Sequence, residues 1–217
     1  MPFVDAVPRR RMPAAKRREL ILAAAEDVFA RSGYHGASLD EIAGAGGISK
    51  ALIYEHFDSK RELRACLLEA HTAELFGRLQ ASAEAGATGE ERLRGGIEAF
   101  LGFVEERRAA WRALFRDAAD PEVAGRIQGV RAQAAALIAE LIATDPETPD
   151  SGAAGSDPRR RQYIETLAQL LSGGLQSLAN WWHDHPDVPR RAVVDHATAF
   201  AWLGLERLRD SARETRD

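Results

Sequence analysis

The sequence predicts an all-α fold, and three observations support this. Apolar residues recur at the helical period of 3.6 along most of the 217 residues, and no segment shows sustained alternation of apolar and polar residues. Helix start and stop signals separate the apolar stripes. We therefore expect a small N-terminal three-helix domain over residues 1–62 and a larger helical domain over residues 63–217.

The first predicted helix covers residues 14–32. Its apolar stripe would face the core of a small domain, and it consists of Leu20, Ile21, Ala24, Ala25, Val28 and Phe29. The helix should stop at Ser32-Gly33, because glycine tolerates the left-handed backbone that often ends a helix.

The segment from Ser38 to Lys60 predicts two short helices joined by a tight turn. Ser38 followed by Glu41 has the spacing of a capping box, in which each residue satisfies a backbone amide of the other. Gly46-Gly47 supplies the positive φ that a sharp turn requires.

The second short helix should begin after Ser49, whose hydroxyl can cap it. Ile53 and Phe57 form an inward-facing apolar pair, and Ser59 with Glu62 predicts a capping box for the next helix. This layout is typical of a helix-turn-helix, which places one helix in the DNA major groove. Other faces of the second helix carry Lys50, Ala51, Leu52, Tyr54 and His56.

Helical patterns continue to the end of the chain. A long helix is expected over residues 60–83, and a polar loop rich in Pro, Gly and Ser over residues 145–158. The remaining helices are expected at residues 90–106, 108–118, 121–143, 159–184 and 189–210.

The helix at 159–184 is apolar on more than one side, and Ser172, Gly173 and Gly174 in its middle would allow another helix to approach closely. Together with the helix at 189–210 it offers more apolar surface than one subunit covers, which predicts a homodimer through a four-helix interface. The alternative is that both helices complete a monomeric core.

Charge is distributed unevenly along the chain. Residues 1–67 contain more basic than acidic residues, whereas the remainder is acidic. This favours a polyanionic partner bound at one end. Arg9-Arg10-Arg11 and Lys16-Arg17-Arg18 would form an arm along the DNA backbone or, alternatively, a solvated tail and an ordinary helix face.

Composition excludes several classes of protein. Hydrophobic residues make up 45% and charged residues 29% of the chain, as in a globular protein. No apolar run is long enough to span a bilayer, and no secretory signal follows the N-terminal basic residues. We therefore expect a cytoplasmic protein that does not insert into membranes. The single cysteine, Cys66, is expected to be a small buried residue.

The N-terminal third resembles the DNA-binding domain of the tetracycline-repressor (TetR) family of bacterial transcription regulators. The residues that carry the resemblance are Val28-Phe29, Gly33-Tyr34, Ser38-Leu39-Asp40-Glu41-Ile42-Ala43, Gly47-Ile48-Ser49, Ile53-Tyr54, His56-Phe57, Lys60 and Leu63. The resemblance implies an all-helical, dimeric C-terminal domain that holds a ligand.

The resemblance also implies roles in DNA binding. Ser38, Ser49, Tyr54, His56 and Lys60 would contact the phosphate backbone. Lys50, Ala51 and Leu52, at the exposed start of the recognition helix, would meet base edges, where lysine can donate to guanine O6 or N7.

An unknown small-molecule effector is implied for the C-terminal domain. The aromatic candidates for its pocket are Phe100, Phe103, Trp111, Phe115, Trp181 and Trp182. Aromatic residues at helical spacing also serve as ordinary core or interface residues, so this alternative stays open. No polar residue stands out as an anchor, and an apolar or aromatic effector is the default expectation.

Neither a metal site nor an enzyme is predicted, and no cofactor is expected. His183-Asp184-His185 with Asp187 has the composition of a metal site, but its position at a helix end favours a solvated terminus. Motifs for phosphate-binding loops, nucleophile elbows and zinc hydrolases are absent from the sequence.

The sequence as a whole predicts a homodimeric, ligand-released repressor that binds a palindromic operator. The alternative is a helical ligand-binding or protein-interaction protein of the same fold that has lost DNA binding. Ala37, Ala51 and Glu55 depart from the family's pattern and are what favours this alternative.

Overall fold

The computed structural model describes residues 12–112, 121–143 and 158–214, and it forms helices joined by short connections without a strand in these ranges. The prediction of an all-α fold is confirmed. The chain divides into two compact units, Met1–Leu67 and Leu68–Asp217.

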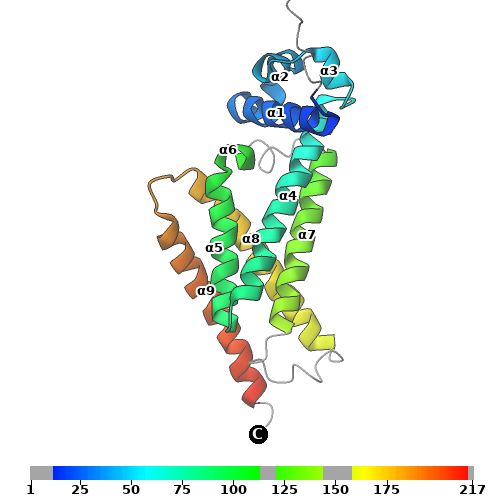
Figure 1. Ribbon diagram of the computed structural model, residues 1–217. Coiled ribbons are helices and arrows are strands. Elements are labelled where there is room, and N and C mark those ends of the chain that lie inside the picture. Colours follow the sequence, from blue (N-terminus) through cyan, green and yellow to red (C-terminus); the bar gives the residue numbers. More distant parts are fainter. Residues whose placement is uncertain (1–11, 113–120, 144–157, 215–217) are drawn as a thin grey trace, which may run out of the picture. The chain divides into compact units, whose positions relative to one another are not determined.

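The first unit contains α1 (Ala14–Gly36), α2 (Leu39–Gly46), α3 (Lys50–Tyr54) and the start of α4 (Lys60–Ala85). Helices α1 and α2 pack against each other, and α3 follows α2 after a short turn (Figure 1). The fully buried side chains of this unit include Ile21, Ala25, Val28, Phe29, Ile42, Ile53, Phe57 and Leu63. The predicted inward orientation of Ile53 and Phe57 is therefore confirmed.

Two glycines with positive φ shape this unit. Gly33 (φ 69°) interrupts α1 at the predicted stop, and one further helical turn runs to Gly36. Gly47 (φ 61°) ends α2 in the left-handed region. Its neighbour Gly46 lies so close to α1 that a Cβ atom there would come within 3.2 Å of the Cβ of Ala24.

The predicted helix starts form with one difference. The Ser38–Glu41 capping box is complete, and the Ser49 hydroxyl accepts a hydrogen bond from the backbone N–H of Leu52. At α4 only half of the expected capping box forms. The Ser59 hydroxyl accepts a hydrogen bond from the backbone N–H of Glu62. The Glu62 carboxylate, however, accepts from the backbone N–H of Asp58, one residue before the Ser59 N–H that a capping box would use.

The second unit is a bundle of long helices. It contains the rest of α4 with α5 (Gly89–Glu106), α6 (Arg108–Ala110), α7 (Pro121–Ala143), α8 (Pro158–His183) and α9 (Arg190–Glu214). Helix α7 runs beside α8, and α5 runs beside α9 (Figure 1). The predicted helix at 108–118 and the predicted loop at 145–158 lie largely outside the described residues.

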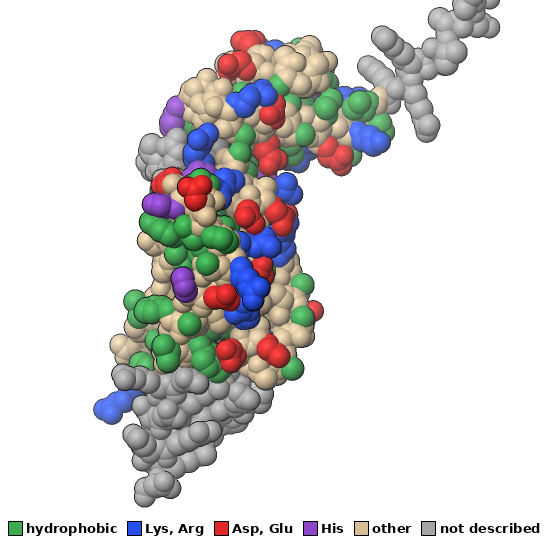
Figure 2. All heavy atoms as spheres, turned by 90° about the vertical axis from the view of Figure 1, so that its left-hand side faces the viewer, with side chains coloured by type: hydrophobic (Ala, Val, Ile, Leu, Met, Phe, Trp, Pro, Cys, Tyr) green, Lys and Arg blue, Asp and Glu red, His purple; other side chains and the backbone are tan. Residues whose placement is uncertain are grey.

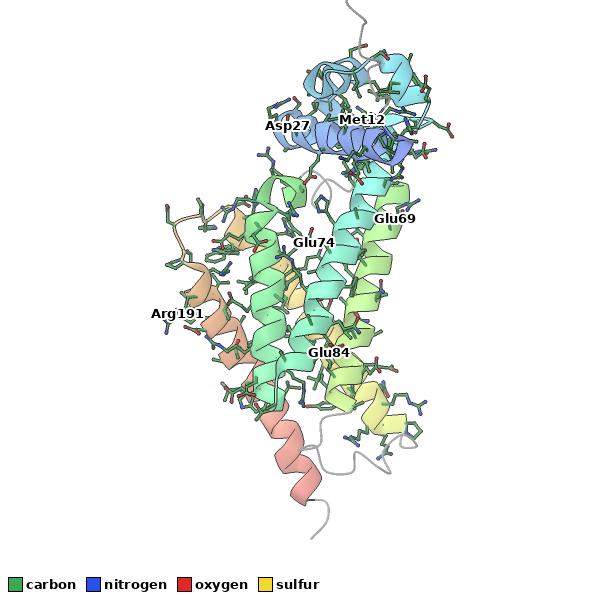
Figure 3. All side chains as sticks on the ribbon, viewed as in Figure 1. Met12, Asp27, Glu69, Glu74, Glu84 and Arg191 are labelled. Atoms are coloured by element: carbon green, nitrogen blue, oxygen red, sulfur yellow. The ribbon has the colours of Figure 1, made fainter. Side chains whose placement is uncertain are left out.

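Charged side chains fasten α5 to its neighbours. Glu74 on α4 lies toward α5 (Figure 3) and accepts hydrogen bonds from Arg107, at the end of α5, and from Arg78 at 2.6 Å. Between α5 and α9, Arg190 pairs with Glu98 and Glu105, each at 2.9 Å. These contacts hold α4, α5 and α9 in register around the interior of the unit.

Candidate DNA-binding site and ligand cavity

The two serines predicted to contact phosphates stand at helix N-termini. The Ser38 hydroxyl accepts from the N–H of Glu41 at 3.2 Å and donates to the Glu41 carboxylate at 2.9 Å. The hydrogen bonds from Ser38, that of its side chain above all, hold the pKa of Glu41 below its usual value. The Ser49 hydroxyl keeps its proton available for a phosphate, because in the contact with Leu52 it acts as an acceptor.

The start of α3 presents the residues predicted to meet base edges. Lys50 and Ala51 are exposed, whereas Leu52 is half-buried. The Lys50 ammonium donates to the Asp40 carboxylate on α2 at 3.0 Å. Tyr54, at the end of α3, is 53% exposed and can reach a partner outside the domain.

The ammonium group of Lys60 is already engaged within the domain. It donates to the carbonyl oxygens of Tyr34 and Ala37 at 2.8 and 2.7 Å and lies 4.6 Å above the Tyr34 ring. These carbonyls belong to the end of α1, where helical partners run out. One of the three ammonium protons is therefore left for a phosphate.

His56 contacts Arg17, a residue that the sequence placed only in a basic run. The Arg17 Nε donates to the His56 Nε2 at 3.4 Å, so in this contact Nε2 acts as an acceptor. This arrangement puts the proton of a neutral imidazole on Nδ1. The basic arm at Arg9-Arg10-Arg11 lies outside the described residues.

Cys66 is half-buried rather than fully buried. The Arg18 guanidinium donates to its sulfur at 3.1 Å and stacks 4.9 Å from the centre of the Phe57 ring. These contacts fasten the first turns of α1 to α4 within the first unit.

A cavity of about 170 Å³ lies inside the second unit. Its walls come from α4, α5, α7, α8 and α9 and from Trp111, and they are predominantly aliphatic. Along α7 the lining extends from Ile127 to Ile142, which corresponds to about 22 Å of helix. The cavity is therefore long and apolar.

Among the described residues, three arginines line this cavity: two of them lie at one end, and the third, Arg131, lies near the middle of α7. Arg92, in the first turn of α5, and Arg160, in the first turn of α8, are among its lining residues. The ends of α4 and α7 lie at the same end of the bundle (Figure 1). The polar groups Ser172 and Gln176 line the cavity further along α8. This set of groups suits an elongated apolar molecule with an anionic head.

Two of the predicted aromatic residues line the cavity. Phe100 and Trp111 do so, with their rings 5.7 Å apart, and the Trp111 indole N–H donates to Asn180 on α8. Phe103 is fully buried outside the cavity and packs against His71. Phe115 lies outside the described residues.

The two adjacent tryptophans of α8 also lie outside the lining. Trp181 is 46% exposed and stacks on His185. Trp182 is buried, and its indole N–H donates to the carbonyl of Val188 at 2.7 Å. The pair therefore divides between the surface and the core of the second unit.

Exposed hydrophobic side chains gather along α8 and α9. Phe200 and Leu203 on α9 are 84% and 65% exposed, and Tyr163, Leu170 and Trp181 follow one face of α8 at intervals of two and three helical turns. Figure 2 shows hydrophobic side chains grouped on this side of the unit, beside a column of charged ones.

Other kinds of site find no support in the described part of the chain. No group of three or more His, Cys, Asp and Glu side chains there is arranged to hold a metal ion, and this includes the segment around His183 and His185. None of the helices in the described residues is long and apolar enough to cross a bilayer.

Comparison with known proteins assigns each of the two units to a protein family model. Residues 90–204 match the family model "Tetracyclin repressor-like, C-terminal domain", and residues 21–66 match "Bacterial regulatory proteins, tetR family". The chain is 29% identical to the HTH-type transcriptional activator FasR of Mycolicibacterium smegmatis over 197 residues, which cover 90% of this chain and 85% of FasR.

Solved structures show the same architecture. A TetR-like transcriptional regulator from Rhodococcus sp. RHA1 is 31% identical and superposes with a TM-score of 0.72, over 90% of this chain and 99% of that one. FadR from Bacillus subtilis, solved in complex with stearoyl-CoA, is 18% identical with a TM-score of 0.64, over 84% of this chain and 96% of FadR. The chain belongs to the TetR family and is a DNA-binding transcription regulator.

Proposed function

We propose that this protein is a homodimeric repressor that a long-chain acyl compound releases from its operator. The observation that carries the proposal is the long apolar cavity with two arginines at one end, in a chain whose first unit is a helix-turn-helix domain. Each of three parts of this proposal has its own support.

The exposed apolar face of α8 and α9 supports the homodimer. Exposed hydrophobic residues that are grouped on one side of a domain mark interaction surfaces. Gly173 and Gly174 are exposed on α8, and an added Cβ atom at either would meet no other atom of the protomer, so a second helix can approach there. A two-fold symmetric pairing of α8 and α9 would bury this face in both subunits.

Dimerisation would determine which kind of operator the first unit binds. Two copies of α3 would enter successive major grooves about 34–36 Å apart on a palindromic site. Lys50 would donate to base edges. Ser38, Ser49, Tyr54, His56 and the remaining proton of Lys60 would contact phosphates. Residues 1–62 would thus read DNA, and residues 63–217 would bind the effector and the partner subunit.

The cavity supports a long-chain acyl effector. Its aliphatic walls match an alkyl chain, and Arg92 with Arg160 supplies positive charge for a carboxylate or for the phosphates of an acyl thioester. The complex of B. subtilis FadR with stearoyl-CoA favours the same class of ligand here. Because α4 contributes both to the cavity wall and to the first unit, a ligand that moves α4 would change DNA affinity.

A second candidate is an activator. The similarity to FasR, which is an activator, favours this candidate, and it extends over 90% of the chain. Ligand-controlled DNA affinity is common to both candidates, and the position of the operator relative to the promoter distinguishes them.

The test begins with selection of a binding site by the full-length protein from a random DNA pool. Fluorescence anisotropy then measures its affinity for that site with stearoyl-CoA or with free coenzyme A, which has the same head group and no chain. We expect stearoyl-CoA to weaken DNA binding at least about tenfold, equivalent to about 1.4 kcal/mol of coupling, and coenzyme A to have no effect. Unchanged affinity with saturating stearoyl-CoA would rule out the acyl effector.

A further inference from the structure

The helix-turn-helix carries little positive charge for a segment that binds DNA. Between Ser38 and Asp58, Lys50 is the one Lys or Arg in the sequence, whereas Asp40, Glu41, Glu55 and Asp58 are acidic. Sequence-independent affinity for DNA comes mainly from cations that neutralise phosphates. The state of the Lys50 ammonium therefore decides how strongly this segment attracts arbitrary DNA.

Lys50 does not serve the stability of its own helix. It is the first residue of α3, directly after the capping residue Ser49. A cation at a helix N-terminus opposes the helix dipole, so this position is electrostatically unfavourable for lysine. The charge of Lys50 is therefore not used by α3 itself and can interact with another group.

Asp40 is that group in the free protein. It lies in the first turn of α2 and accepts the hydrogen bond from the Lys50 ammonium at 3.0 Å. This hydrogen bond is the main cause of a raised pKa of Lys50. The two side chains are 44% and 74% exposed, so DNA can reach both of them.

Other cations of the first unit are engaged differently. Lys60 donates to backbone carbonyls and Arg18 to the sulfur of Cys66, while Arg64 is buried beneath the Tyr34 ring. Those contacts hold the fold together. The Lys50–Asp40 pair is exposed, and an exposed pair of this kind exchanges partners at a small cost in free energy.

We propose that Asp40 is a specificity-determining residue of this regulator. It holds the Lys50 ammonium and keeps it from the phosphates of arbitrary DNA. It yields the ammonium where a base edge in the major groove, such as guanine O6 and N7, offers replacement acceptors. The inference rests on the base-reading role proposed above for Lys50.

The test compares Asp40→Asn with a matched control, Asp27→Asn. Asp27 is an exposed residue of α1 (Figure 3) that pairs with Arg31, so both variants lose one exposed carboxylate and one ion pair. Fluorescence anisotropy measures the affinity of each full-length variant for a random duplex at several salt concentrations. The same titrations are made on the site that the wild-type protein selects from a random pool.

We expect Asp40→Asn to bind the random duplex about two- to fivefold more tightly than Asp27→Asn does, because Lys50 is released. The slope of log affinity against log salt should steepen by about 0.9, the value for one further phosphate neutralised. Affinity for the selected site should change less, so the ratio of specific to random affinity falls. Asp40→Asn combined with Lys50→Met should lose the gain on random DNA.

Equal random-duplex affinities and salt slopes for the Asp40→Asn and Asp27→Asn variants would overturn the proposal. A gain that persists in the double variant would also overturn it, because Lys50 would then not be the group released. Failure of the proposed function looks different: the wild-type protein would select no motif, or Lys50→Met would leave the selected motif unchanged.

Discussion

The two units of this protein use their hydrophobic residues in different ways. In the first unit, side chains such as Ile21, Ile53 and Phe57 are almost completely buried. In the second unit, apolar side chains line a cavity, and others, such as Phe200 and Leu203, lie exposed on α9. The first unit is closed by its own side chains, whereas the second has room for a ligand and a face for a partner.

This difference suggests a division of labour. A closed, well-packed domain keeps α3 in a fixed geometry, which reading base edges requires. A ligand that enters the cavity makes new contacts with the residues that line it, and so changes the energy of the surrounding helices.

Replacing Phe57 and Phe100 by alanine, one at a time, compares the two interiors directly. Phe57→Ala should lower the free energy of unfolding by about 3–5 kcal/mol, as expected for a fully buried phenylalanine. Phe100 is only half-buried at the wall of the cavity, so Phe100→Ala should cost clearly less. Chemical denaturation measures both values, and equal losses would contradict the comparison.

Replacing Phe200 by glutamate tests the exposed face. A hydrophobic residue central to a dimer interface contributes about 2 kcal/mol or more, so Phe200→Glu should shift the protein from dimer to monomer. Met12→Glu introduces the same charge at a 45% exposed hydrophobic residue of the first unit and serves as the control. Sedimentation equilibrium measures the association state, and an unchanged dimer in Phe200→Glu would place the interface elsewhere.

Filling the cavity should remove the response to ligand and keep the fold. Gly96 lines the cavity, and an added Cβ atom there meets no other atom within 4 Å. The Gly96→Leu variant should therefore fold normally, and its free energy of unfolding should rise by at most about 1 kcal/mol because leucine has the higher helix propensity. Its DNA affinity should no longer respond to stearoyl-CoA. The control is Gly129→Leu, at an exposed position of α7 outside the cavity. It should show the same rise in the free energy of unfolding and retain the response of DNA affinity to stearoyl-CoA.

The capping box should make a small, pH-dependent contribution. Ser38→Ala should lower stability by about 1 kcal/mol. Because the pKa of Glu41 is held below its ordinary value of 4.5, its contribution is present above that pH and is lost as the pH falls through the lowered pKa. Thermal unfolding between pH 3 and 7 should show a smaller acid-induced loss for Ser38→Ala than for Ser49→Ala. Parallel pH profiles would contradict the role of Glu41.

The features of the first unit that sequence predicted are local ones. The Ser38–Glu41 box, the Gly47 turn and the Ser49 cap each depend on residues within a few positions of one another. Such contacts are set by backbone geometry and residue type, so spacing alone indicates them. The burial of Ile53 and Phe57 follows in the same way from helical periodicity.

Contacts between distant parts of the chain were not predictable in this way. The phosphate contact of Lys60 stays a prediction, but the sequence did not indicate that its ammonium also donates to carbonyls 23 and 26 residues earlier, at the end of α1. Phe100 and Phe103 lie one turn apart on α5, yet one borders the cavity and the other packs into the core. Periodicity shows that both residues face inward, but the neighbouring helices decide what each one meets.

Amide hydrogen exchange of the full-length protein with and without stearoyl-CoA tests the division of labour most directly. We expect the ligand to slow exchange in the cavity-lining parts of α5, α7 and α8, and to leave the core amides of α1 and α2 unchanged. Slower exchange in α1 and α2 without a change in the second unit would contradict the account, because the ligand would then act on the unit that is already closed.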